Sequence, residues 1–532
     1  MSIHKTKNPG FKTFSSSSKI DGSDDRASLK PRTTVNEEAA GQFSVSDREI
    51  DSSEEGKSRK QIVDETSILE TSNERREALD KPSIDQLRQR NKISRLIRKD
   101  QKLLNNDSWS KRKGHTLTYA GVFLFTLTLY FRPYELIPAL SALSSMAMIL
   151  AVVTLVVYVP TQLSIESSLT ILTTEVKCIL FLAFWAVLTI PIAKNPGLAW
   201  ETFNETLSKV VIIFVIMVNT LRTKLRLKGL MWLAIGVGVM LSYQALDLYQ
   251  KGEFATEGYR VSVDFGGMFG NPNDMAGHLV IFMPVAVVLG LASKKKLAKL
   301  MYFVAAGMMV AGNMVTQSRG GFLGLITVAA VLVWKIGKNQ RLKSILISGV
   351  LALIIIALAP GNYGIRMLSI FVPALDSVGS SDQRTELLKQ SFLVTLRNPL
   401  GIGLGNFPIV GTRNLETHNA FTQVSAELGW LAFAAYMIFM ISPWRKLAAI
   451  ERQIVRREDN SWIYLTSIGL QASIAGYMVS SFFGSVAYQW YIYYPIAFAV
   501  CLRRIYQTEY ANDQILETSE IRSDGTLKLQ KA

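Results

Sequence analysis

The chain has 532 residues, of which 49% are hydrophobic, and its 58 Lys and Arg against 42 Asp and Glu give a net charge of +16. Its apolar residues gather in runs of roughly 18 to 22, long enough to cross a bilayer as helices, which argues against a set of soluble domains. Lys and Arg fall mostly between these runs, so the basic charge does not indicate a nucleic-acid partner. Cys178 and Cys501 lie inside apolar segments, which argues against a disulfide framework and a thiolate metal site.

Residues 1–115 are rich in Ser, Lys, Arg, Asp and Glu and show no sustained apolar periodicity. Such a composition cannot bury enough apolar surface to order itself, so we expect a disordered cytoplasmic extension. The stretch 83–104 is interpreted as solvated, although a basic helix near an anionic leaflet also fits its charges. No apolar core follows the first basic residues, so the first membrane helix is expected to direct insertion.

Twelve candidate membrane spans follow, and they predict an all-α, polytopic membrane protein. They cover 117–131, 136–158, 173–192, 207–221, 229–247, 274–292, 298–316, 320–336, 343–360, 420–441, 462–483 and 486–505. Lys and Arg gather after spans 4, 6, 8, 10 and 12, and short cytoplasmic loops retain such residues. We therefore expect both termini inside, a membrane domain over 116–506 and a cytoplasmic tail over 507–532.

The largest loop on the outer side is expected over 361–418. Within it, 382–396 has the pattern of an amphipathic helix, and the glycine-rich turn GIGLGNF follows at 401–407. This turn does not follow a strand, so it lacks the structural context of a dinucleotide motif. The sequence has no P-loop and no metal-ligand spacing of His, Cys, Asp and Glu, and we expect neither a metal nor a cofactor.

The outer loops carry few charges, and those that are present are informative. Arg260 precedes GGMFGNPNDMAGH, Arg319 lies in TQSRGGFLG, Arg384 opens the loop helix, and His418 lies in ETHNAF. Arginine stays charged and offers a planar fork to phosphate oxygens, which favours an anion site. A neutral imidazole accepts a hydroxyl proton near neutral pH, which favours His418 as a base. The structural alternatives are solvated or membrane-anchoring arginines and a histidine that only starts a helix.

Three helices are expected to begin on this outer side, with Asn273, Ser318 and Thr417 as their caps. Their amino ends would present free N–H groups and partial positive charge beside the arginines, as an anion site requires. A plain turn and helix cap explains Asn271 and Asn273 as well. Glu427 is the main ionisable residue inside a span, and we expect it to satisfy a neighbouring helix.

At these residues the sequence resembles the O-antigen ligase and polymerase superfamily of bacterial membrane glycosyltransferases. The resemblance covers 210–504 and rests on FGNPND (269–274), QSRGGFLGL (317–325), NPLGIGLGNF (398–407) and THNAFTQVSAELGWL (417–431). It implies about twelve spans with a large periplasmic loop, in the inner membrane of a bacterium. It also implies metal-independent transfer of a glycan from undecaprenyl diphosphate to an acceptor hydroxyl, in the synthesis of lipopolysaccharide or another cell-envelope polysaccharide.

The resemblance also assigns roles to residues. It implies that Arg260 and Arg319 hold the departing diphosphate, and that His418 removes or orients the acceptor proton. Arg260 stands further from the NPN segment than the family pattern has it. The residues expected to bind substrate are Arg384, Asn271, Asn273, Gly403, Gly405 and Asn419.

The resemblance leaves the acceptor open: a ligase moves finished chains to a lipid or protein, and a polymerase extends the glycan itself. Two other classes remain. A transporter of lipid-linked oligosaccharide or exopolysaccharide would need charged groups along a path open to both sides, and charges within the spans are scarce. A non-catalytic scaffold would leave Arg260, Arg319 and His418 unconnected in space.

Overall fold

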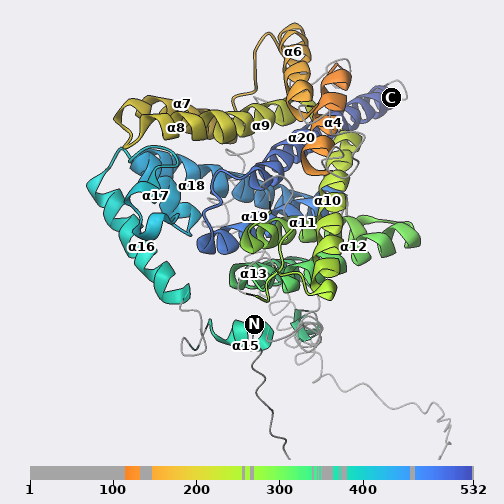
Figure 1. Ribbon diagram of the computed structural model, residues 1–532. Helices are drawn as coiled ribbons and strands as arrows, with labels where there is room; N and C mark the ends of the chain where they lie inside the picture. Colours follow the sequence, from red (N-terminus) through yellow and green to blue (C-terminus); the bar gives the residue numbers. More distant parts are fainter. Residues whose placement is uncertain are drawn as a thin grey trace, which may run out of the picture. The chain divides into compact units, whose positions relative to one another are not determined.

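The computed structural model describes residues 114–131, 146–254, 258–263, 269–337, 341–343, 345–346, 349, 363–370, 372, 380–455 and 462–529. All of them lie within the unit Ser83–Ala532. Every regular element over these residues is a helix, as the all-α prediction requires (Figure 1). The expected extension up to residue 113 lies outside the described residues, and so does most of the ninth expected span, 343–360.

Seven helices of the described part are long and apolar enough to cross a membrane. They are α6 (Met146–Glu166), α7 (Thr174–Thr189) with the turn η2 (Ile190–Ile192), α10 (Lys224–Lys251), α11 (Pro272–Ala292), α12 (Lys296–Val315), α13 (Arg319–Ile336) and α18 (Ala420–Val455). Large apolar side chains stay exposed on α6, among them Ile149, Val152 and Val156, as lipid-facing residues do. The chain is therefore a multi-pass membrane protein, and the total of twelve spans stays a prediction.

Four further helices lie where spans were expected. They are α4 (Thr116–Phe131), which is apolar but shorter, α9 (Ser208–Thr220), α19 (Trp462–Ser480) and α20 (Trp490–Leu529). The short helices α8 (Pro196–Thr202) and η3 (Phe203–Leu207) precede α9. Three helices continue well beyond their expected ends: α6 continues to Glu166 beyond residue 158, α18 to Val455 beyond residue 441, and α20 to Leu529 beyond residue 505. Hydropathy identifies only the apolar part of a helix, whereas the helix itself continues as far as its backbone hydrogen bonds do.

Helix α11 lies in the core of the bundle, where it packs against α10, α12, α13, α19 and α20 (Figure 1). Beyond its first turn its residues are apolar on every face, with His278 as the exception, and a helix without a polar face is a buried one. Glycines bring α13 and α19 close to each other: a Cβ on Gly324 would lie 3.2 Å from the backbone oxygen of Gly476. Small residues of this kind let membrane helices pack tightly.

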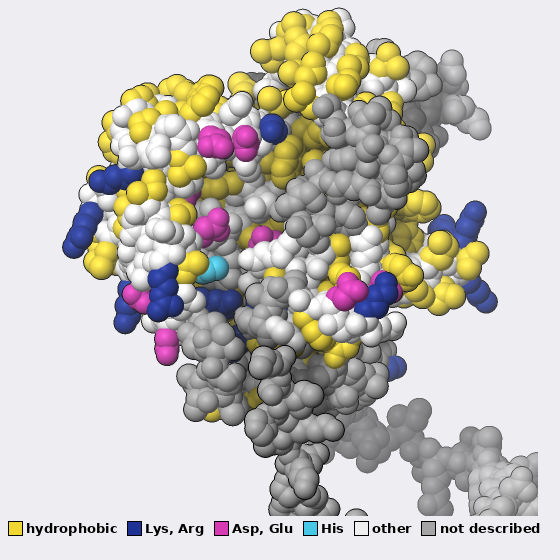
Figure 2. Space-filling model, viewed as in Figure 1, with side chains coloured by type: hydrophobic (Ala, Val, Ile, Leu, Met, Phe, Trp, Pro, Cys, Tyr) yellow, Lys and Arg dark blue, Asp and Glu magenta, His cyan; other side chains and the backbone are white. Residues whose placement is uncertain are grey.

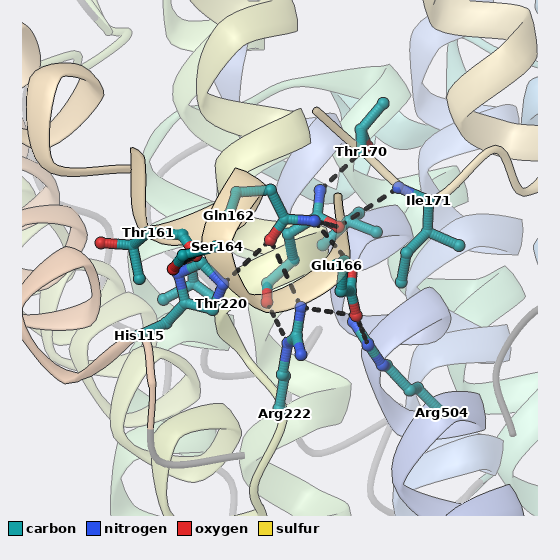
Figure 3. Close-up of polar contacts among 12 residues, drawn as sticks. His115, Thr161, Gln162, Ser164, Glu166, Thr170, Ile171, Thr220, Arg222 and Arg504 are labelled. Atoms are coloured by element: carbon teal, nitrogen blue, oxygen red, sulfur yellow. Dashed lines mark hydrogen bonds and ion pairs between the residues drawn. The ribbon is translucent and has the colours of Figure 1, made fainter. Parts of the chain in front are cut away.

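A buried polar network joins several helix ends (Figure 3). Glu166, at the end of α6, forms ion pairs of 2.8 Å with Arg222, which follows α9, and with Arg504 in α20. Gln162 Oε1 lies 2.9 Å from His115 Nε2, just before α4. These ends therefore lie on one side of the bundle, as the predicted alternation of spans 1, 2, 4 and 12 requires.

The segment between α13 and α18 forms short helices. These are α15 (Tyr363–Leu368), α16 (Ser380–Arg397), α17 (Phe407–Val410) and η5 (Thr412–Asn414). Helix α16 confirms the amphipathic helix expected over 382–396. Its residues Leu387, Ser391 and Thr395 are buried at four-residue spacing, and Thr395 Oγ1 lies 3.1 Å from Ser425 Oγ of α18. That face holds α16 against α18.

Candidate functional site

Three loops of the candidate site enter their helices through a residue with left-handed backbone geometry. Phe269 has φ 65°, Gln317 has φ 50° and His418 has φ 51°, shortly before α11, α13 and α18. A residue with a side chain adopts this conformation at a cost, and it persists only where the surroundings hold it. Such positions cluster at functional sites, so the three loops are candidates for parts of one site.

The N-terminus of α13 is capped as the sequence predicts, because Ser318 Oγ accepts from the Gly321 N–H at 3.2 Å. The cap of α11 is Asn271, whose Oδ1 accepts from the Asn273 N–H at 2.8 Å. The prediction of Asn273 as the cap was wrong by two residues. Pro272 stands at the first helical position, where its fixed φ favours a helix start.

The cap of α18 is Asn419, so the prediction of Thr417 was wrong as well. Asn419 Oδ1 accepts from the N–H groups of Phe421 and Thr422 at 2.9 and 3.1 Å. The Thr417 hydroxyl instead donates to the Asn419 carbonyl at 2.9 Å. Thr417 thereby closes the turn that carries His418.

Arg260 joins the beginnings of α11 and α13. Its Nη2 donates to Asn273 Oδ1 at 2.9 Å, and its Nε donates to the Thr316 carbonyl at 3.1 Å. The Ser318 hydroxyl donates to the same Asn273 oxygen at 2.8 Å. Arg260 is only 4% exposed, so these contacts anchor a buried guanidinium directly behind the turn that carries Arg319.

A pocket of about 220 Å³ opens where α13, α16 and the start of α18 meet η6 (Ser481–Phe483). Figure 2 shows a hollow on this face of the molecule, with a histidine beside basic and acidic side chains. The polar lining residues are Arg319, Arg384, Thr385, Thr417, His418 and Asn419. The apolar ones are Ile370, Leu388, Phe482 and Phe483. One pocket thus combines cationic, basic and aromatic groups.

The structure brings four of the predicted site residues to this pocket. Arg319, Arg384, His418 and Asn419 line it, although they come from three separate segments of the chain. The other five predicted residues are not among the lining residues that the structure describes; they are Arg260, Asn271, Asn273, Gly403 and Gly405. Their expected roles in the reaction stay predictions.

The electrostatic surroundings suit His418 to accept a proton. Burial lowers the pKa of His418 below its usual value, and the Arg384 guanidinium lowers it further. The imidazole therefore stays neutral at neutral pH and keeps a lone pair available. Arg319 stands at the first position of α13, so it adds its charge to that of a helix N-terminus.

The glycine-rich loop pairs with a break in α18. Helical geometry stops at Gly429, which has φ 80° and ψ −176°. The loop supplies partners on both sides of this break: the Gly403 N–H donates to the Glu427 carbonyl at 2.9 Å, and the Trp430 N–H donates to the Pro399 carbonyl at 3.1 Å. The loop therefore fixes the part of α18 that follows His418.

Glycine is required in this loop by its packing. Gly403 has φ 104°, and a Cβ there would lie 2.3 Å from Ala193 Cβ. Gly405 has φ 70°, and its Cβ would lie 2.5 Å from Thr202 Oγ1. Glycine is therefore needed at both positions, because the chain at η2 and α8 lies too close to the loop to leave room for a Cβ.

Some residues of the site carry no signal in the sequence. Ser485 Oγ accepts from the His418 N–H at 2.9 Å, although the two residues are 67 positions apart. Arg366 stacks on Tyr259 with 5.0 Å to the ring centre, and its Nε donates to the Gln317 carbonyl at 2.9 Å. These residues reach the site through tertiary contacts between segments that are far apart in the sequence, and no local sequence pattern predicts such contacts.

The fold and the pocket define the class of this protein: a multi-pass helical membrane protein whose pocket joins arginines and a histidine at helix N-termini. Residues 304–437 of the chain match the family model described as O-Antigen ligase. The matched segment contains Arg319, Arg384 and His418, and over these residues it confirms the resemblance to the O-antigen ligase and polymerase superfamily. No curated protein matches the chain.

Proposed function

We propose that the protein transfers a glycan from undecaprenyl diphosphate to an acceptor hydroxyl at the periplasmic face of a bacterial inner membrane. One observation carries this proposal: Arg319, Arg384 and His418 line the same pocket. Groups that bind a diphosphate and a group that accepts a proton must reach one substrate at the same time. A scaffold would have no need for this convergence.

The arginines suit the diphosphate of the donor. Arg319 lies at the N-terminus of α13, where free N–H groups and its own planar fork favour phosphate oxygens. Arg384 comes from α16, so the pocket offers cations from two elements. Phe482 and Phe483 form apolar surface beside them, which suits the prenyl chain or the face of a sugar ring. Arg260 supports this arrangement through Asn273 and Ser318.

The reaction is a single displacement at the anomeric carbon. The acceptor oxygen forms a bond to that carbon while the bond to the diphosphate oxygen breaks. The acceptor proton passes to the neutral imidazole of His418, and the electron pair leaves with the diphosphate. Arg319 and Arg384 stabilise the charge that develops there, which is where preorganised cations lower a barrier most.

Glycan transfer by the purified full-length protein tests the proposal. A synthetic undecaprenyl-diphosphate oligosaccharide serves as donor, with a chelator present, and wild type is compared with His418→Ala and Arg319→Ala. Arg397→Ala provides the matched control, since Arg397 is exposed on α16. We expect transfer by wild type and the control, and a loss of at least about a hundredfold in both site variants.

The outcomes separate the alternatives. Undiminished transfer by His418→Ala and Arg319→Ala would contradict the assigned site. If wild type gives no transfer with any offered acceptor and instead moves the lipid-linked oligosaccharide across liposomes, the transporter alternative gains. Transfer by wild type that occurs without chelator and is lost with it would contradict the metal-independent step. A ladder of products indicates a polymerase, whereas one addition to a lipid or protein indicates a ligase.

A further inference from the structure

The turn that carries His418 is held against its own backbone preference. His418 has φ 51°, and the next residue caps α18. Left-handed geometry costs energy for a residue with a side chain, and it persists only where the surroundings hold it. The contacts of this turn therefore decide where the imidazole stands in the pocket.

Ser485 provides the contact from outside the turn. Its Oγ accepts from the His418 N–H at 2.9 Å and lies 3.3 Å from Thr417 Oγ1. It also hydrogen bonds with the Glu416 carboxyl. One hydroxyl thus touches three consecutive residues of the turn.

Ser485 is itself fixed, because buried side chains from three helices hold the loop 484–489. The loop contacts are Gln423 Oε1 to the Ala487 N–H at 3.2 Å, the Tyr477 hydroxyl to the Val486 carbonyl at 3.1 Å, and the Tyr493 hydroxyl to the Ala487 carbonyl at 2.9 Å. Each of these loop groups is buried. Buried hydrogen bonds are costly to break, so this loop offers a rigid support.

We propose that Ser485 is a positioning residue for His418: it holds the backbone N–H of the base and so sets the imidazole against the acceptor hydroxyl. This inference rests on the proposed function, because it needs His418 to act as the base. Ser485 is not among the residues that line the pocket in the described structure, so it acts through His418.

Loss of the Ser485 hydroxyl has a specific consequence. The His418 N–H loses its acceptor, and the turn relaxes toward negative φ. Donor binding rests on Arg319 and Arg384, which do not depend on this contact. The effect therefore falls on kcat for transfer, while KM for the donor stays close to that of wild type.

The pH profile reports the same change. The charged groups around His418 are Arg319 of α13, Arg384 of α16 and Glu416 of its own turn. Burial and Arg384 lower the pKa of His418, so an imidazole that leaves this place regains a higher pKa. The acid limb of kcat/KM then moves to higher pH.

The test compares the purified full-length wild type with Ser485→Ala, Ser485→Thr and Ser473→Ala. Ser473 is the matched control, since its buried hydroxyl bonds to backbone carbonyls within the bundle. We expect kcat of Ser485→Ala to fall by about tenfold to a hundredfold, as a displaced catalytic group does. Ser485→Thr keeps the hydroxyl and should restore most of the rate and the pH profile, and Ser473→Ala should leave both unchanged.

Three results would overturn the inference: wild-type kcat in Ser485→Ala, no rescue by Ser485→Thr, or a loss confined to donor KM. If Ser485→Ala does not fold, Tyr477→Phe serves instead, because it removes one support of the loop and should lower kcat in the same manner. His418→Ala separates the two proposals. Full activity in His418→Ala contradicts the proposed function, whereas an inactive His418→Ala beside a fully active Ser485→Ala contradicts only the role of Ser485.

Discussion

Arg260 Nη2 donates a hydrogen bond of 2.9 Å to Asn273 Oδ1, and this oxygen also accepts from Ser318 Oγ at 2.8 Å. A single amide oxygen therefore ties a buried guanidinium to the first turn of α11 and to the cap of α13. The position of Arg319, the next residue after Ser318, depends on this contact.

Asn273→Ala should destabilise the protein and slow transfer together. It takes one acceptor from a buried arginine, which costs about 1–3 kcal/mol of unfolding free energy. Thermal unfolding in one fixed detergent should show a lower apparent melting temperature, and the transfer assay a lower rate. Asn204→Ala, at an exposed position of η3, is the control. Equal melting temperatures for Asn273→Ala and wild type would show that the contact is unimportant.

Arg384→Gln should move the pH dependence of transfer in a defined direction. Burial lowers the pKa of His418 and the Arg384 guanidinium lowers it further, so loss of that charge lets the pKa rise. The imidazole is then protonated at higher pH, and the acid limb of kcat/KM shifts upward. Arg397→Gln on the exposed face of α16 should leave the limb in place. A shift to lower pH in Arg384→Gln would contradict the assignment of the limb to His418.

Gly403→Ala should be far more harmful than an equal change in a lipid-facing helix. The added Cβ would lie 2.3 Å from Ala193 Cβ, at a backbone φ of 104°. We expect a loss of about 2–4 kcal/mol in unfolding free energy from overpacking and strain. Gly307→Ala in α12 meets nothing within 4 Å and should be neutral or stabilising. Comparable melting curves for the two variants would show that the loop adapts.

Glu166→Gln should destabilise the buried network at the other end of the bundle. Glu166 pairs with Arg222 and Arg504, and the two guanidinium groups are 0% and 3% exposed. Removal of a charge shared by buried partners costs about 3 kcal/mol or more. Asp247→Asn is the matched control, because the Asp247–Lys251 pair is solvent-exposed and its loss should leave the melting curve close to that of wild type. Thermal unfolding in one fixed detergent measures the loss. A melting temperature of Glu166→Gln equal to that of wild type would contradict the structural role of this network.

The sequence alone predicted the helices and part of the site because both depend on local properties. A run of apolar residues is long enough to span a bilayer whatever its neighbours are, so 320–336 and 420–441 were found without knowledge of their partners. The charge of arginine and the ability of histidine to accept a proton belong to the side chains themselves, so Arg319, Arg384 and His418 are recognisable in the sequence. Ser318 was identified as a cap for the same reason, since its hydroxyl bonds three residues ahead.

Tertiary structure decided what those residues touch. In the folded bundle, Arg319, Arg384 and His418 line one pocket, and Arg260 lies behind it. Gly403 and Gly405 allow η2 and α8 to lie close to the glycine-rich loop. The fold also brings Ser485 to the His418 N–H across 67 residues. Such contacts join segments that only packing of the whole bundle brings together, and a hydroxyl or glycine in the sequence does not say which distant atom it will meet.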